Sequence, residues 1–183
     1  TYTYDTLGRL TKVIDPSGGY YTFTYDKNGN RTSMTDALGN TTTYTYSTYN
    51  QPIAVTDGLG NQTAFTYDVS GNMITMKDKR GNTTTMTYDA LNRLIKQTDP
   101  LGNVTSFTYD ANDNLTSITD PRGKVTSYTY NSLNLLTKLS FPDASSEEYT
   151  YNPLGNLTNF KNRKADNITS TYDQINRLIK KTY

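Results

Sequence analysis

The feature that most constrains this chain is its strict internal repeat. A tyrosine recurs at a fixed 21-residue interval from Tyr4 to Tyr172, and a threonine precedes every one of these tyrosines. A fixed period indicates a repeat architecture, in which each unit buries its apolar surface against its neighbours. We therefore interpret residues 1–183 as a single tandem array of about nine units, an excerpt of a longer repeat region. The tyrosines expected to form a structural ladder are Tyr4, Tyr25, Tyr46, Tyr67, Tyr88, Tyr109, Tyr130, Tyr151 and Tyr172.

Each unit begins with a pattern that predicts a strand followed by a tight turn. The residue two before the tyrosine is large in most units, as in Phe23-Thr24-Tyr25, and such alternation is typical of a half-buried strand. An Asp, Asn or Ser follows the tyrosine, and three residues later stands a Gly, Asn or Asp, the types that best accept positive φ. The glycines expected in this first turn are Gly8, Gly29, Gly71 and Gly155.

A second strand, such as Leu94 to Thr98, and a second turn complete the unit. Most second turns place an Asp three residues before a glycine, and these glycines are Gly18, Gly39, Gly60, Gly81, Gly102 and Gly123. In the seventh and eighth units the spacing is lost, because Phe141-Pro142-Asp143-Ala144 and Asn162-Arg163-Lys164-Ala165 replace it. This replacement leaves room for a shift of strand register there.

Turn signals about ten residues apart, with no helical periodicity between them, predict an all-β fold. We expect tandem 21-residue antiparallel β-hairpin repeats that form a curved or spiralling sheet, either a shell segment or a fibre. Two strands per unit give roughly eighteen strands, and open sheets rarely exceed about ten without curling. A parallel β-solenoid with one coil per repeat unit is the alternative that the sequence leaves open.

Composition argues against several functional classes. Histidine and cysteine are absent, so the commonest general base and thiolate ligands are missing, and we expect no enzyme, cofactor or metal site. The formal charge of +1 does not favour nucleic acid, and no apolar run approaches the length of a membrane span. Asp26 to Asn30 and Asp110 to Asn114 resemble the start of a calcium loop, but they lack its sixth-position glycine and distant glutamate, so ordinary turns are favoured.

Eight Asn-x-Thr sequences stand mostly at two fixed positions of the repeat, beside the turns. The repeat consensus itself accounts for them, yet in a glycosylating secretory route they would be exposed acceptors. The candidate glycosylation residues are Asn30, Asn40, Asn61, Asn82, Asn103, Asn114, Asn156 and Asn167.

The first unit contains Tyr4-Asp5-Thr6-Leu7-Gly8-Arg9-Leu10 and then Asp15-Pro16-Ser17-Gly18. This segment, like Tyr88 to Leu94 with Asp99 to Gly102, resembles the YD repeat of the rearrangement-hotspot (Rhs) family. The resemblance extends over essentially the whole chain. It implies consecutive β-hairpins that spiral into a hollow shell, as in Rhs toxins, insecticidal toxin complexes, wall-associated proteins and teneurins. Toxin members enclose a C-terminal effector, but the resemblance transfers no catalytic residue to this chain.

The expected apolar face of such a sheet needs a cover, because large exposed apolar patches are interfaces or aggregation sites. The cover is the array's own curvature, another copy or enclosed cargo. The leading hypothesis is therefore a structural scaffold of a secreted, extracellular or cell-surface Rhs-type shell or fibre. Its partners would be neighbouring repeats of the same or identical chains, with polypeptide cargo in the shell case. The alternative is a cell-surface adhesion module that binds glycans.

Overall fold

The computed structural model describes all of residues 1–183 and consists of strands and turns, with no helix. Two compact units are present, Thr1–Arg93 with Thr98–Leu101, and Leu94–Gln97 with Gly102–Tyr183. The strands are β1 (Tyr2–Tyr4), β2 (Leu10–Ile14), β3 (Tyr20–Tyr25), β4 (Arg31–Thr35), β5 (Thr41–Tyr46), β6 (Pro52–Thr56), β7 (Gln62–Tyr67), β8 (Met73–Lys77), β9 (Thr83–Tyr88), β10 (Leu94–Thr98), β11 (Val104–Tyr109), β12 (Leu115–Thr119), β13 (Val125–Tyr130), β14 (Leu136–Ser140), β15 (Ser146–Tyr151), β16 (Leu157–Lys161), β17 (Asn167–Tyr172) and β18 (Leu178–Thr182).

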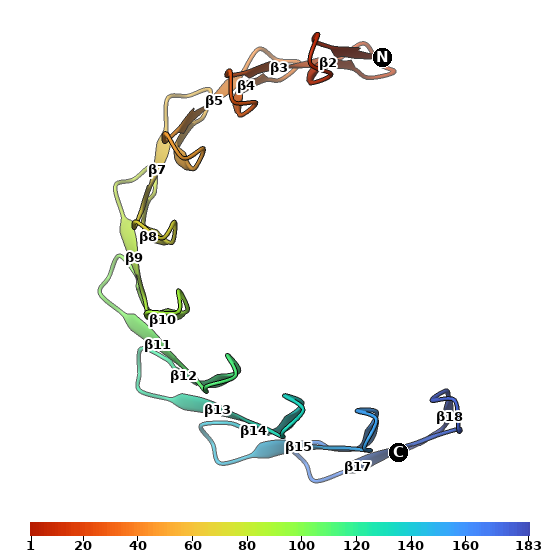
Figure 1. Ribbon diagram of the computed structural model, residues 1–183. Helices are drawn as coiled ribbons and strands as arrows, with labels where there is room; N and C mark the ends of the chain where they lie inside the picture. Colours follow the sequence, from red (N-terminus) through yellow and green to blue (C-terminus); the bar gives the residue numbers. More distant parts are fainter. The chain divides into compact units, whose positions relative to one another are not determined.

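Within each unit, strands that follow one another in the sequence pair side by side and antiparallel (Figure 1). Inside a hairpin, as between β3 and β4, four residue pairs form, from Thr22↔Thr35 to Tyr25↔Arg31. Between hairpins, as from β2 to β3, three residue pairs form, from Lys12↔Thr22 to Ile14↔Tyr20. The predicted antiparallel hairpin repeats are thus confirmed, and the parallel solenoid is excluded.

A β-bulge lies beside the tyrosine in the hairpins β1–β2, β3–β4, β5–β6, β7–β8, β11–β12, β13–β14, β15–β16 and β17–β18. In β3–β4 the register shifts between Thr24 and Tyr25, so that Thr32 has no partner across the ladder. The Thr32 hydroxyl instead lies 2.8 Å from that of Thr24. A bulge bends its strand and increases the local twist. The same small bend therefore recurs in each hairpin, and the row of strands in each unit bends gradually along its length (Figure 1).

Both turns of the repeat share one hydrogen-bonding pattern. In the first unit the Asp5 N–H donates to the Arg9 carbonyl at 2.9 Å, and the Gly8 N–H donates to the Asp5 carbonyl at 3.0 Å. One Asp5 carboxylate oxygen accepts the N–H groups of Leu7 and Arg9, each at 2.9 Å. Gly8 has φ of +76°, which L-residues rarely adopt, so the turn requires an acceptor side chain first and Gly, Asn or Asp fourth.

The expected conformations of the turn residues are confirmed at all positions predicted from the sequence. All ten named turn glycines have positive φ: Gly8, Gly18, Gly29, Gly39, Gly60, Gly71, Gly81, Gly102, Gly123 and Gly155. The first turns without glycine place Asn50, Asn92, Asp113, Asn134 and Asn176 in the same conformation.

The irregular second turns of the seventh and eighth repeats do not shift the register, although their sequence left room for a shift. The Phe141 N–H still donates to the Ser145 carbonyl, and β14–β15 pairs from Lys138↔Glu148 to Ser140↔Ser146, as in the other units. The cost falls on Ala144 and Ala165, which adopt φ of 65° and 69°. A left-handed alanine costs roughly 1–2 kcal/mol, which the turn hydrogen bonds and the flanking ladders outweigh.

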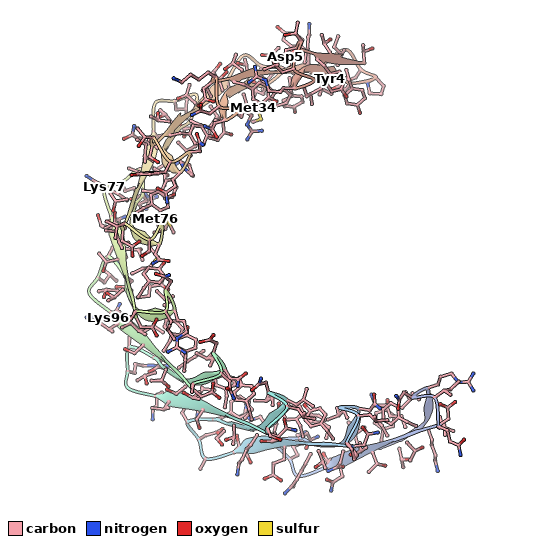
Figure 2. The ribbon with its side chains drawn as sticks, viewed as in Figure 1. Tyr4, Asp5, Met34, Met76, Lys77 and Lys96 are labelled. Atoms are coloured by element: carbon pink, nitrogen blue, oxygen red, sulfur yellow. The ribbon has the colours of Figure 1, made fainter.

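The sheet has two chemically different faces. Figure 2 shows Met76 and Lys77, neighbours in β8, pointing to opposite sides of the ribbon. One face, called the tyrosine face, carries the ladder tyrosines, the large residues two positions before them, and Met76. The other, called the threonine face, carries Lys77 and the exposed threonines such as Thr24. No side chain is fully buried on either face, so the structure is a single layer whose apolar residues are at best half-buried.

Candidate functional surface

The ladder tyrosines connect successive hairpins through their hydroxyl groups. From Tyr25 onward each donates to the backbone carbonyl 15 residues earlier, at 2.8–3.0 Å. The acceptors are the first residues of the preceding second strands: Leu10, Arg31, Pro52, Met73, Leu94, Leu115, Leu136 and Leu157. Tyr4 has no preceding hairpin in this chain and is 57% exposed.

These hydroxyls bind carbonyls that the sheet itself leaves free. The β14–β15 ladder ends at Lys138↔Glu148, two residues short of Leu136, where the strands diverge. The Tyr151 hydroxyl reaches back to the Leu136 carbonyl at 2.9 Å and satisfies it. Burial raises the pKa of Tyr151, in agreement with a phenol that is partly shielded from water. The tyrosine therefore continues, through its side chain, the inter-hairpin hydrogen bonding that the backbone has ended.

Arginine side chains cover tyrosine rings in the first repeats. The Arg9 guanidinium carbon lies 4.8 Å from the Tyr25 ring centroid, and its Nη1 donates to the Asp26 carbonyl at 2.8 Å. Arg31 lies 4.8 Å from the Tyr44 centroid. Cation–π contacts of this kind contribute about 0.5–1 kcal/mol at exposed sites. The 21-residue repeat pattern does not predict these arginine–tyrosine contacts, because Arg9 and Arg31 are 16 and 13 residues from their rings.

A carboxylate lies on the tyrosine face of the second compact unit, Leu94–Gln97 with Gly102–Tyr183. Glu147 of β15 accepts the Tyr149 hydroxyl at 2.8 Å, and the Tyr149 ring lies 5.1 Å from that of Phe160. Burial, reinforced by the Glu147 hydrogen bond and charge, raises the pKa of Tyr149 to about 12. On the opposite face, Glu148 lies between Lys138 and Lys161, at 3.8 and 3.7 Å.

The turn aspartates direct their oxygens into their own turns. Asp26 Oδ1 accepts the N–H groups of Asn28 and Asn30, and Oδ2 accepts the Asn30 amide, each at 2.9 Å. The Asn30 side-chain hydrogen bond, followed by these backbone bonds, lowers the pKa of Asp26. Asp110 makes the equivalent bonds to Asn112 and Asn114. No group of three or more Asp or Glu side chains lies close enough to hold a metal ion, so neither calcium-like turn has a ligand cluster.

The candidate glycosylation residues differ in how their amides are used. Asn40, Asn82, Asn103 and Asn167 are exposed, whereas Asn30, Asn61, Asn114 and Asn156 are half-buried. Asn30 Nδ2 donates both to Asp26 Oδ2 and to Asn50 Oδ1, at 2.9 and 2.7 Å. Similar bonds between side chains 20 residues apart join Asn72 to Asn92, Asn114 to Asn134 and Asn156 to Asn176. Nothing in the repeat pattern predicts these asparagine pairs.

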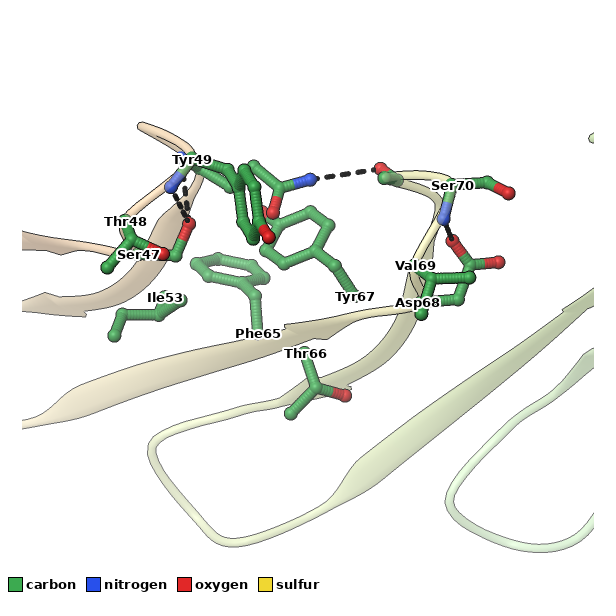
Figure 3. A pocket seen from close by; sticks show the side chains of 12 residues that line it. Ser47, Thr48, Tyr49, Ile53, Phe65, Thr66, Tyr67, Asp68, Val69 and Ser70 are labelled. Atoms are coloured by element: carbon green, nitrogen blue, oxygen red, sulfur yellow. Dashed lines mark hydrogen bonds between the residues drawn. The ribbon is translucent and has the colours of Figure 1, made fainter.

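A groove opens in the first compact unit, between the first turns of the third and fourth repeats (Figure 3). Its apolar lining includes Tyr49, Ile53, Phe65, Tyr67 and Val69. The Tyr49 ring projects from its turn and is 84% exposed. The groove coincides with the turn that departs most from the pattern, where serine replaces the usual aspartate.

The two walls of this groove are joined by side-chain hydrogen bonds. Gln51 Nε2 donates to the Gly71 carbonyl at 3.3 Å. The Tyr67 hydroxyl donates to the Pro52 carbonyl at 2.8 Å. The Ser47 hydroxyl accepts the N–H groups of Tyr49 and Gln51 at 3.2 and 3.3 Å, longer than the bonds to the aspartates. The groove is thus held by neutral groups, with Asp68 as its one ionised lining residue.

No helix in this structure meets the length and hydropathy that a membrane crossing requires.

The model of the family described as RHS Repeat matches residues 25–60, 46–84, 88–123 and 109–146, together more than half of the chain. No curated protein matches it.

Solved structures with a similar fold include the crystal structure of TcdB2–TccC3 without its hypervariable C-terminal region. That alignment has a TM-score of 0.74 and 17% identity, and covers 97% of this chain and 12% of the other. TcdB2–TccC3 itself gives 0.70 and 18%, with 93% and 12% covered. The Tc holotoxin pore of Photorhabdus luminescens gives 0.52 and 16%, with 99% and 13% covered. The present chain thus spans about an eighth of these proteins' length, and the similarity concerns the fold.

Proposed function

Because the chain belongs to the RHS repeat family, we propose that it is a structural scaffold, a wall segment of an extracellular or cell-surface Rhs-type shell or fibre. The observation that carries this proposal is a single-layer sheet without a fully buried side chain, in which neighbouring hairpins are joined by backbone ladders and tyrosine hydroxyls. Such a layer gains stability by addition of repeats and not by enclosing its own core.

The tyrosine face supports a wall with two different sides. Its tyrosines, leucines and methionines are half-buried at best, so further burial by another layer or an enclosed polypeptide would remove apolar surface from water. The threonine face, with its exposed Thr24, Thr45 and Thr66, suits contact with water. One of the similar structures belongs to a holotoxin pore, which favours a secreted protein. The resemblance to Rhs toxins supports an enclosed polypeptide cargo.

Electron cryomicroscopy of the native full-length protein tests the scaffold. Closed hollow particles containing additional density are expected for a shell, and filaments with an axial repeat are expected for a fibre. Discrete globular particles, in which the repeats fold back to bury the tyrosine face within one domain, would refute both forms. Fractionation of the producing cells tests the location, since an extracellular scaffold accumulates outside the cytoplasm.

A glycan-binding adhesion module is the second candidate, since it predicts a patch that interrupts the repeat. The third repeat contains such an interruption, with Tyr49 at the tip of a first turn whose initial residue is Ser47. Screening the 183-residue chain against a panel of neutral and acidic oligosaccharides tests this alternative. Saturable binding that Tyr49→Ala abolishes would favour adhesion over a purely structural role.

A further inference from the structure

The first repeats show which chemical group the tyrosine rings of this fold accept. Arg9 lies over the Tyr25 ring and donates to the Asp26 carbonyl, which also accepts the Gly29 N–H. Arg31 lies over the Tyr44 ring and donates to its hydroxyl at 3.1 Å. In both places a planar guanidinium lies against an aromatic ring that the single-layer sheet otherwise leaves open to water.

The groove presents the equivalent rings without these cations. The residue that corresponds to Arg9, 16 positions before the ladder tyrosine, is Gln51 for Tyr67. The residue that corresponds to Arg31, 13 positions before the ring, is Pro52 for Phe65. Both guanidinium positions of the earlier repeats are therefore occupied by uncharged residues, and no Lys or Arg lines the groove.

Two features add to the groove what a cation requires. Tyr49 is the only aromatic residue at the tip of any first turn, and it supplies a third ring beside Phe65 and Tyr67 (Figure 3). The Asp68 carbonyl accepts the N–H of Gly71 at 3.1 Å. The Asp26 carbonyl accepts the equivalent turn N–H and, in addition, the Arg9 guanidinium. The Asp68 carboxylate adds a negative charge to a lining that has no positive one. Aromatic rings around a desolvated cation attract it through their quadrupoles.

We propose that the groove of Tyr49, Phe65 and Tyr67 binds the guanidinium group of an arginine side chain presented by a polypeptide partner. The guanidinium stacks on the Tyr67 ring, as Arg9 does on Tyr25, and donates to the Asp68 carbonyl. This site is an addition to the scaffold function and does not depend on whether the array closes into a shell.

The test is a titration of the ¹⁵N-labelled 183-residue chain with N-acetyl-arginine amide, followed by NMR. N-acetyl-citrulline amide is the matched probe, since it has nearly the same shape without the charge. Saturable shifts of the amides of Tyr49, Gln51 and Val69 are expected with arginine. Citrulline is expected to bind at least about tenfold more weakly. Equal binding of the two probes, or no saturable shift with arginine, overturns the proposal.

Three variants locate the site. Gln51→Arg places an internal guanidinium over Tyr67, as in the first repeat, and is expected to abolish binding. Tyr49→Ala removes an exposed ring and is expected to weaken binding about tenfold. Leu91→Ala, at the same turn position two repeats later, is the control and is expected to bind as the unmodified chain does. Unchanged arginine binding in both Gln51→Arg and Tyr49→Ala overturns the assignment, as does an oligosaccharide that competes with arginine for the same amides.

Discussion

The role of the tyrosine hydroxyls as inter-hairpin connections is open to a direct test with Tyr151→Phe. The change removes the oxygen that donates to the Leu136 carbonyl at 2.9 Å and leaves the ring in place. A hydrogen bond of this kind contributes about 0.5–1.5 kcal/mol net. The site is only half-buried, so water replaces part of the loss, and we expect a cost of about 1 kcal/mol, a factor of about five in the equilibrium between closed and open hairpins.

Amide hydrogen exchange measures this opening where it occurs, since local unfolding free energies vary along a repeat array. Protection of the β14–β15 ladder, from Lys138↔Glu148 to Ser140↔Ser146, is expected to fall about fivefold in Tyr151→Phe. Tyr4→Phe is the matched control, because Tyr4 has the same repeat position and no hairpin before it in this chain. Equal effects of the two changes, or a loss of protection spread evenly over both compact units, would refute the role of the Tyr151 hydroxyl as a connection between hairpins.

Three further predictions follow from the turns and from the tyrosine face. The turn aspartates, such as Asp26, have lowered pKa values in the folded chain. Their stabilising contribution is therefore present above the ordinary pKa of 3.8 and is lost as the pH falls below it. The urea concentration at the midpoint of unfolding is expected to drop between about pH 5 and pH 2. Ala144→Gly relieves a left-handed alanine and is expected to raise the free energy of unfolding by up to about 1 kcal/mol in urea titrations, whereas Gly39→Ala lowers it. Burial and Glu147 raise the pKa of Tyr149 to about 12, and an NMR titration of the Tyr149 ring signals is expected to show this. Glu147→Gln is expected to bring that pKa closer to 10 without restoring it fully, because burial is the larger cause, and an unchanged pKa would contradict the role of the carboxylate.

Local chemistry made most of the fold predictable. A turn that needs an acceptor side chain first and positive φ fourth constrains its residues wherever it occurs, so Asp5 and Gly8 specify the turn on their own. The alternation of a large residue, threonine and tyrosine specified the first strand of each hairpin, because it is likewise a local pattern. The register after Phe141 could not be settled from the sequence, because the sequence shows the missing aspartate and glycine, whereas the register depends on the sum of the flanking ladders.

Features set by longer distances were not predictable. The second strands alternate poorly because the bulge inverts their phase, which places Leu10 and Val13 on the same face although they are three residues apart. The acceptor of each tyrosine hydroxyl depends on where the inter-hairpin ladder ends, which the pattern does not reveal. Tyr49 was visible as an aromatic turn tip, but its significance required the positions of Arg9 and Arg31 over their rings.

The asparagine pairs explain why asparagine recurs at the positive-φ position of every second first turn from the third repeat onward. Glycine is the least strained choice, and the second, fourth and eighth units have it as Gly29, Gly71 and Gly155. The third, fifth, seventh and ninth units have Asn50, Asn92, Asn134 and Asn176, whose side-chain oxygens accept an amide from the preceding unit. From the second repeat onward, every second hairpin therefore has an asparagine at this position, which combines positive φ with a contact that glycine cannot make. Gly8 in the first repeat and Asp113 in the sixth depart from a strict alternation of glycine and asparagine.

Asn92→Gly separates these two contributions. Glycine relieves the backbone at φ of 62° but removes the acceptor for Asn72 Nδ2, now 2.8 Å away. If the pair matters more, the change is expected to lower the free energy of unfolding by about 0.5–1 kcal/mol, and a double-mutant cycle with Asn72→Ala is expected to show coupling of similar size. Stabilisation by Asn92→Gly, as expected for Ala144→Gly, would mean that backbone strain dominates and that the two-hairpin alternation has no energetic basis in these pairs.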